Sequence, residues 1–188
     1  MKTRDYEERR QYLSFTLAGG DYAVGILQVK EILQYETVTR VPSVPASVRG
    51  VINLRGSVVP VIDLAVKFGL APMPVTNGTC VLIVEAALEG ERAVMGVLAD
   101  SVREVLELGP ADVEAPPTFG TAVKVEFITG MAKVGKGFVL LLDLDKVISA
   151  REKAAAAELS AEPAAAIPAP DSAAAAVPPA PTETRVSG

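Results

Sequence analysis

Residues 41–64, VPSVPASVRGVINLRGSVVPVIDL, are the stretch that decides the fold of this chain. Two prolines near its start fix the backbone and keep it out of a long helix. Two runs rich in β-branched residues follow, 51–54 and 58–64, and they are joined across Arg55-Gly56-Ser57. Runs of this composition around a glycine turn predict a β-hairpin. Because proline cannot donate to a sheet ladder, Pro60 predicts an edge strand or a bulge.

The hairpin sequence recurs in a weaker form later in the chain. GVINLRGSVVPVIDL, which starts at Gly50, aligns without a gap on GMAKVGKGFVLLLDL, which starts at Gly130. Upstream of each copy, VKEIL (29–33) matches VREVL (102–106). Chance similarity between apolar strands is the alternative explanation. Two matches in the same order favour a supersecondary unit that occurs twice.

The other segments predict short strands and short helices. Residues 12–17 alternate apolar and polar side chains, which is typical of a half-buried strand. GILQVKEIL (25–33) spaces its apolar residues by three and four, and it predicts a short amphipathic helix or an irregular helical turn. Residues 101–108 fit either a strand or a helix. Asp63 and Asp143 each precede a short segment that they can cap as a helix. Short strands separated by glycine turns indicate an all-β protein of two small barrels, each with about five strands.

Composition divides the chain into three parts. Residues 1–10, MKTRDYEERR, predict a flexible charged arm, and residues 11–150 hold the apolar strand segments. Residues 151–188 are dominated by alanine and proline, so they predict a disordered tail with no apolar set to bury. The segment AREKAAAAEL (150–159) can still hold a helical turn or two.

The overall composition restricts the class of protein. Of the 188 residues, 49% are hydrophobic and only 5% are aromatic, so we expect a core of Val, Ile and Leu in strands. A net charge of −5 without a basic cluster argues against a nucleic-acid or anionic-membrane surface. Cys80 is the single cysteine, which excludes an internal disulfide. The sequence has no apolar leader and no run of membrane-spanning length, and this predicts a soluble, cytoplasmic protein.

The sequence offers little for catalysis. It contains no histidine, which removes the commonest general base and the commonest metal ligand. The acidic pairs Asp100/Glu104 and Asp143/Asp145 are explained better as caps or solvated faces than as acid–base or metal sites. We therefore expect no catalytic residue, no metal ion and no cofactor.

Arg55 and Glu31 fit either a binding interface or an ordinary surface. An exposed arginine on a turn is usually solvated and contributes little energy. Arginine is also enriched at binding hot spots, because its planar guanidinium pairs bidentately and its stem buries apolar area. Glu31 shares its segment with Gln28 and Lys30, and a solvated face explains it equally well.

RGVINLRGSVVPVIDL (49–64) resembles the signature of the CheW-like family, the coupling proteins of bacterial chemotaxis arrays. FTLAGGDYAVGILQVKEIL (15–33) resembles the opening of the family. MGVLADSVREVLEL (95–108) and EFITGMAKVGKGFVLLLDLDKVIS (126–149) resemble its second half. The resemblance implies two intertwined five-stranded barrels of the Src-homology-3 type. It also implies a non-enzymatic adaptor that joins the cytoplasmic tip of methyl-accepting chemoreceptors to the histidine kinase CheA. No kinase or receiver sequence is attached, so we expect the single-domain coupling protein.

The resemblance further implies a receptor-binding groove between the two barrels. Matched by motif, the groove would be lined by Val29, Glu31, Val102 and Val105, and flanked by Asn53, Arg55 and the close-packed Gly50. The homologous regulatory domain of CheA would bind at the barrel ends, and copies of this chain would join in rings. The receptors would recruit the protein to the inner face of the membrane. The residues that contact the kinase are not assigned.

Other functions remain open at this point. An adaptor of a chemosensory pathway that controls pili, gliding or gene regulation fits the same residues. A regulatory barrel that binds a small ligand or a metal would need convergent polar groups in a pocket. The absence of histidine and the mainly apolar groove residues count against it. A hydrolase is disfavoured because no nucleophile with a base is evident.

Overall fold

The computed structural model describes residues 9–88, 90–118 and 120–161 of the chain. Strands dominate these residues, and the helices are short except for one at the C-terminal end. The strands are β1 Arg10–Leu17, β2 Gly20–Gly25, β3 Val29–Gln34, β4 Val48–Leu54, β5 Ser57–Ile62, β6 Cys80–Leu88, β7 Glu91–Ala99, β8 Ser101–Leu108, β9 Val113–Glu114, β10 Ile128–Val134 and β11 Gly137–Leu142. The α-helices are α1 Leu64–Lys67, α2 Leu144–Val147 and α3 Ala150–Ala161, and the 3-10 helices are η1 Ile26–Gln28, η2 Pro110–Asp112 and η3 Val125–Phe127.

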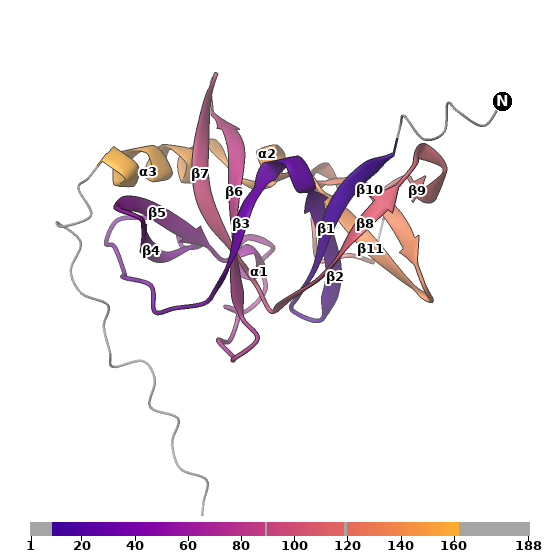
Figure 1. Cartoon of the computed structure of the whole chain (residues 1–188), viewed down its shortest axis with the longest axis horizontal. Helices are drawn as coiled ribbons and strands as arrows, with labels where there is room; N and C mark the ends of the chain where they lie inside the picture. Colours follow the sequence, from indigo (N-terminus) through magenta and orange to yellow (C-terminus); the bar gives the residue numbers. More distant parts are fainter. Residues whose placement is uncertain (1–8, 89, 119, 162–188) are drawn as a thin grey trace, which may run out of the picture.

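The strands form two small barrels that the chain interlaces. The first barrel contains β3, β6, β7, β5 and β4 in that order, and the second contains β8, β1, β2, β11, β10 and β9. Figure 1 shows the first barrel on the left and the second on the right. The N-terminal hairpin β1–β2 pairs with β8 and, in parallel, with β11, so the second barrel needs both ends of the folded region. The prediction of an all-β fold with two intertwined barrels is confirmed.

The sequence repeat is a structural repeat with the same register. Val48 pairs with Ile62 in the first hairpin, and Ile128 pairs with Leu142 at the equivalent place in the second. Both hairpins carry a bulge directly after this pair. Each hairpin then leads into a one-turn helix that begins after a capping aspartate. The carboxylate of Asp63 accepts from the N–H of Ala65 at 3.0 Å, and that of Asp143 accepts from the N–H of Asp145 at 3.1 Å.

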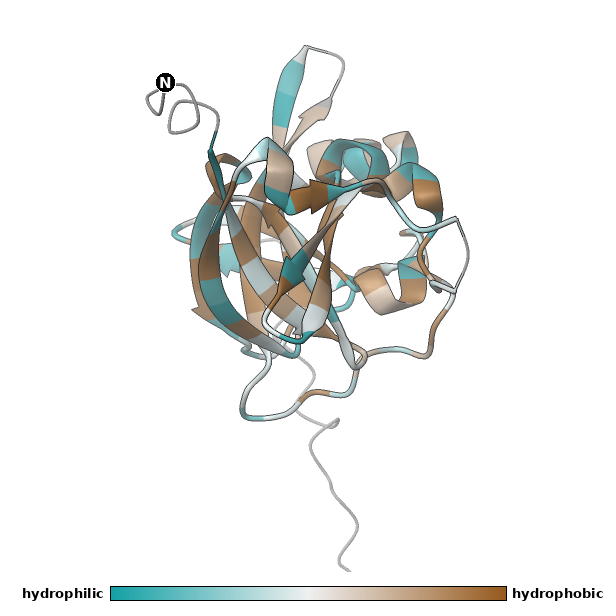
Figure 2. Cartoon of the chain, turned by 90° about the vertical axis from the view of Figure 1, so that its right-hand side faces the viewer, coloured by the Kyte–Doolittle hydropathy of each residue, from teal (hydrophilic) through white to brown (hydrophobic). Residues whose placement is uncertain are grey.

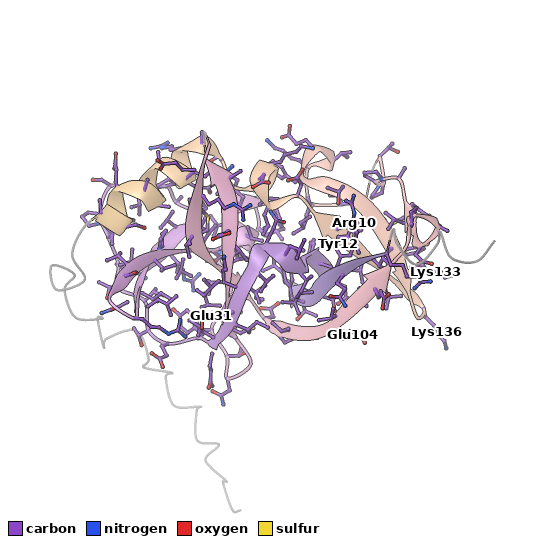
Figure 3. The ribbon with its side chains drawn as sticks, turned by 45° about the horizontal axis from the view of Figure 1, so that its top comes forward. Arg10, Tyr12, Glu31, Glu104, Lys133 and Lys136 are labelled. Carbon is purple, nitrogen blue, oxygen red and sulfur yellow. The ribbon has the colours of Figure 1, made fainter. Side chains whose placement is uncertain are left out.

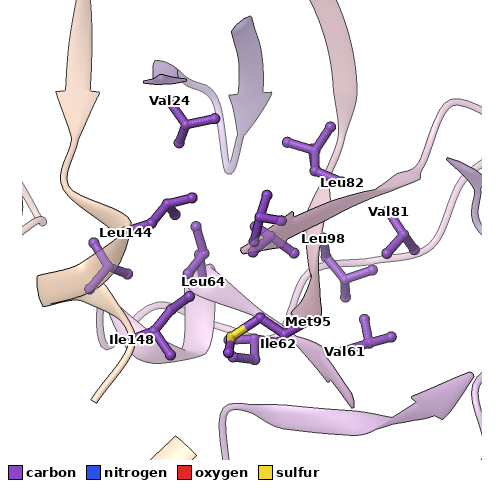
Figure 4. Close-up of a cluster of buried hydrophobic side chains, with 14 of the residues drawn as sticks. Val24, Val61, Ile62, Leu64, Val81, Leu82, Met95, Leu98, Leu144 and Ile148 are labelled. Atoms are coloured by element: carbon purple, nitrogen blue, oxygen red, sulfur yellow. The ribbon is translucent and has the colours of Figure 1, made fainter. Parts of the chain in front are cut away.

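One large hydrophobic cluster joins the two barrels. It includes Leu13 and Phe15 of β1, Leu82 of β6, and the two residues that open the short helices, Leu64 and Leu144. Figure 4 shows the part of this cluster around α1 and α2. In Figure 2, the strands of the second barrel alternate between hydrophilic and hydrophobic residues, as a sheet with one covered face requires. A smaller cluster fills the interior of the second barrel (Ala23, Leu106, Leu108, Ala132, Val139 and Leu141). The two barrels therefore share their main core.

The folded region extends further than the expected boundary at residue 150. Helix α3 continues to Ala161 and packs on β5 and β7 of the first barrel, although it follows directly from the second (Figure 1). Glu152 is almost fully buried, at 2% exposure, and Ala156 is buried as well. This helix has no stripe of large apolar residues. It contacts the first barrel through small alanine side chains and a buried carboxylate. The tail predicted for the remaining residues, 162–188, and most of the predicted arm lie outside the described residues.

One local expectation about backbone structure was right only in part, and another was wrong. GILQVKEIL contains a helical turn, η1, but Gly25 ends β2 and residues 29–33 belong to β3, where the β-branched residues pair with β6. Pro60 lies on an internal strand, between β4 and β7, and not at an edge. It is tolerated because its partner on β4, Val51, directs both its N–H and its C=O to Thr39 on the other side. Position 60 therefore makes no ladder hydrogen bond to β4. The segment 101–108, for which both possibilities were open, is strand β8 throughout.

Candidate functional site

Arg55 is presented by a tight turn at the tip of the β4–β5 hairpin. Arg55 and Gly56 both have positive φ, 51° and 88°, as in the type I′ turns that match the twist of a hairpin. A positive φ is uncommon for arginine, so the turn holds Arg55 in a strained backbone conformation. The side chain of Asn53 supports the turn, because its Oδ1 accepts from the N–H of Gly56 at 2.9 Å. Asn53 thus positions the turn that carries Arg55.

Arg55 and Glu31 form a bidentate ion pair that links the β4–β5 hairpin to β3. Nη1 donates to Oε1 at 2.7 Å, and Nη2 donates to Oε2 at 2.8 Å. The hydrogen bonds from Arg55 lower the pKa of Glu31, and those to Glu31 raise the pKa of Arg55. The Arg55 side chain is 75% exposed, whereas that of Glu31 is 26% exposed. The guanidinium is therefore oriented by Glu31 and remains open to a partner.

A second ion-pair group lies on the neighbouring strands of the same barrel. Glu85 on β6 accepts from Lys30 on β3 at 2.8 Å and from Arg92 on β7 at 2.9 Å. These hydrogen bonds, the one from Lys30 first, lower the pKa of Glu85. Lys30 and Arg92 are largely exposed, so the group fixes charges across three strands at the surface.

The two predicted groove residues of β8 share one face of the sheet because of a bulge. Val102 and Val105 are three positions apart, so a regular strand would direct them to opposite faces. Their partners on β1 are Phe15 and Leu13, which are two apart and on the same face. One extra residue of β8 is accommodated between these pairs. Val102 therefore packs on the core between the barrels, and Val105 lies beside it with 49% exposure.

The first barrel repeats this arrangement and adds a residue that sequence reasoning missed. On β3 a bulge lies between Val29 and Glu31, so Val29 and Ile32 face the same side as their partners Val84 and Leu82. Val29 packs on the shared core, as Val102 does. Ile32 is 47% exposed and corresponds to Val105 in the repeat. The alignment of VKEIL on VREVL contained this signal.

Gly50 does not line any surface. It is buried in β4, and its backbone approaches that of Thr39 so closely that a Cβ atom would collide with the Thr39 carbonyl oxygen. Gly130 is packed in the same way against Val113 and the Glu114 carbonyl oxygen. Position 50 therefore requires glycine for packing, and the expectation that this close-packed residue flanks the receptor-binding groove stays a prediction.

Most of the predicted groove residues do not line the surface hollows described next. A hollow of about 790 Å³ lies between the start of β1, η1 and the start of α2, and Arg10, Tyr12 and Leu27 are among its lining residues. Figure 3 labels Arg10 and Tyr12 on β1. Another hollow, of about 680 Å³, lies between the β4–β5 hairpin, β7 and α3. Arg55 borders it with Val59 and Ala156.

In each acidic pair, one aspartate accepts a hydrogen bond from a distant backbone N–H group. Asp100 accepts from the N–H of Ala18 at 2.8 Å, and Asp145 accepts from the N–H of Ala87 at 2.7 Å. Within the described ranges, no group of three or more Asp, Glu or Cys side chains is placed to hold a metal ion. No helix in the described part of the chain is long and apolar enough to cross a membrane.

Comparison with known proteins points to one family. The family model described as "CheW-like domain" matches residues 11–152. The chain is 36% identical over 145 residues to the chemotaxis protein CheW of Klebsiella aerogenes, and this alignment covers 77% of this chain and 85% of that protein. It is 31% identical over 146 residues to the chemotaxis protein CheW of Treponema pallidum, which covers 78% and 86%. The crystal structure of the scaffolding protein TtCheW from Thermoanaerobacter tengcongensis superposes with a TM-score of 0.66 at 29% identity, and covers 77% of this chain and 90% of that one.

Proposed function

The chain belongs to the CheW-like family, and from this premise we propose that it is a non-enzymatic scaffold of chemotaxis signalling that couples chemoreceptors to the histidine kinase CheA. The match across nearly the whole folded region, in sequence and in barrel arrangement, carries this proposal. The side chains agree with it, because the sequence contains no histidine and the carboxylates of Asp100, Asp143 and Asp145 accept from backbone N–H groups.

The receptor tip would bind between the barrels, against β3 and β8. The apolar contacts would come from the half-exposed Ile32 and Val105, with Val29 and Val102 beneath them. An amphipathic helix needs such an apolar strip for its hydrophobic face. Arg55, held by Glu31, would supply a charged contact that fixes the register of the helix. The kinase would bind elsewhere, at an end of a barrel.

The test is co-sedimentation with receptor-containing membranes and CheA from the same cell. Wild-type protein should bring the kinase to the membranes. Arg55→Asn should lose the membranes but still bind the kinase in solution. Asparagine before Gly56 is favoured in a type I′ turn, so this variant removes the guanidinium and leaves the hairpin intact. If the wild type binds neither partner, the chain has the fold of the family without the coupling role.

A further inference from the structure

Ser14 is a buried polar side chain in the middle of β1, opposite the bulge of β8. It is 4% exposed and faces the two residues of β8 that lie between the pairs formed by Leu13 and Phe15. Its hydroxyl donates to the carbonyl oxygen of Glu104 at 2.7 Å and accepts from the N–H of Glu104 at 3.1 Å. One hydroxyl thus bonds both backbone groups of the bulged residue, where the ladder between the strands is interrupted.

The bulge that Ser14 holds determines where the next residue points. Because of this one extra residue, Val105 pairs with Leu13 and faces the side of the sheet that packs on the other barrel. Without the bulge, Val105 would lie on the opposite face from Val102. The position of the exposed valine therefore depends on the local conformation of Glu104.

The first barrel holds the equivalent bulge by a different contact. Glu31 corresponds to Glu104 in the repeat, and Figure 3 shows them on β3 and β8. Glu31 is held through its carboxylate by Arg55. Gly135 occupies the position of Arg55 in the second hairpin, so no arginine reaches Glu104 from there. Ile83 occupies the position of Ser14 in the first barrel and has no hydroxyl.

We propose that Ser14 is a positioning residue of the receptor-binding surface, which holds the β8 bulge and so presents Val105 to the partner. This inference rests on the proposed receptor-binding role of the chain. Ser14 touches no partner itself and acts only through Glu104 and Val105. In the second barrel it takes the place that the Arg55–Glu31 ion pair has in the first.

The direct test is Ser14→Ala in the co-sedimentation assay with receptor membranes. The change removes one small hydroxyl and two hydrogen bonds from an otherwise paired strand, so we expect the bulge to loosen while the barrel stays folded. Receptor binding should weaken by about fivefold, the usual effect of one hydrogen bond. Binding to the kinase in solution should not change. Ser14→Thr keeps the hydroxyl and should restore binding, whereas Ser14→Val has the same shape as threonine and should not.

A double-mutant cycle with Val105→Ala separates positioning from general destabilisation. If Ser14 acts through Val105, Ser14→Ala should have almost no further effect on receptor binding in the Val105→Ala background. Amide hydrogen exchange should accelerate at Glu104 and Val105 in Ser14→Ala, and remain as in the wild type at Val24 in the core.

The proposal is overturned if Ser14→Ala binds receptors as the wild type does, or if its effect is equally large without the Val105 side chain. Either result leaves the coupling role intact, because wild type and Arg55→Asn still differ. Loss of binding by the wild type itself would instead refute the proposed function.

Discussion

Replacing Glu152 by alanine should destabilise the whole protein, because this one carboxylate fastens α3 to the first barrel. Its Oε2 accepts from Lys67 Nζ at 2.7 Å and from the N–H and hydroxyl of Ser149, each at 2.8 Å. Its Oε1 accepts from the hydroxyl of Ser47. Since α3 follows the second barrel, Glu152 connects the two barrels through α1 and the segment before β4.

The expected loss follows from the burial of the group. In Glu152→Ala, the ammonium of Lys67, 18% exposed, and the hydroxyl of Ser47, 7% exposed, lose their acceptor. Removing one partner of a buried ion pair costs about 3 kcal/mol. For a domain of this size, such a loss lowers the Tm by about 6–12 °C. Urea unfolding and thermal melting measure both quantities. Glu158→Ala, an exposed position on the same helix, is the control and should change the free energy of unfolding by about 0.5 kcal/mol or less.

The same carboxylate predicts a pH dependence of defined sign. Burial raises the pKa of Glu152, but the hydrogen bonds from Lys67, Ser47 and Ser149 outweigh it, so its pKa lies below the usual 4.5. A carboxylate with a lowered pKa in the folded state stabilises the protein above its unfolded pKa, and this contribution is lost as the pH falls. The difference in unfolding free energy between wild type and Glu152→Gln should be full at pH 7 and shrink below about pH 4.5. A loss below about 0.5 kcal/mol in Glu152→Ala, or a difference that grows on acidification, would refute the reasoning.

Three further predictions concern the binding surface, the packing of the repeat and the chain end. Val105→Asp should weaken receptor binding by about tenfold or more and leave the Tm near that of the wild type, since the side chain is half exposed; a collapsed Tm would place Val105 in the core instead. Gly50→Ala should lower the free energy of unfolding by about 2 kcal/mol in urea titrations, because the Thr39 backbone cannot move aside, whereas Gly137→Ala, with open space around it, should not. Removing residues 162–188 should leave receptor and kinase binding unchanged, and a lost pull-down of either partner would contradict this.

The repeat and its hairpins could be predicted from sequence because their determinants are local. β-Branched runs, glycine turns and capping aspartates all lie within the segments that they define, and the register around Gly50 and Gly130 followed from the alignment. The bulges could not be predicted in the same way, because an extra residue in one strand is visible only against its partner strand. This is why the spacing of three and four in GILQVKEIL indicated a helix beyond η1, whereas Ile32 could have been found as the counterpart of Val105 from the alignment of VKEIL on VREVL.

The same distinction applies to Gly50 and to the chain end. The motif places Gly50 beside the groove, whereas its requirement for glycine comes from Thr39, a contact across the fold that the sequence does not show. Helix α3 was underestimated because binary patterning assumes that a packed helix has an apolar stripe. Here the buried positions are small or charged. Ser149 is a local donor to Glu152, but Ser47 and Lys67, the other two donors that make its burial favourable, lie far away in the sequence.

The two barrels share one architecture, but different contacts hold the bulged strands, β3 in the first barrel and β8 in the second. In the first barrel, the exposed Arg55 binds the side chain of the bulged Glu31. In the second barrel, the buried Ser14 binds the backbone of the bulged Glu104. An exposed ion pair is weakened by salt, whereas a buried hydroxyl is not. The Arg55 side of the surface should therefore lose partner affinity as ionic strength rises, while the Val105 side keeps its apolar contact. A partner that binds both sides at once should therefore take its register from the charged contact at Arg55 and most of its affinity at high salt from the apolar contact at Val105.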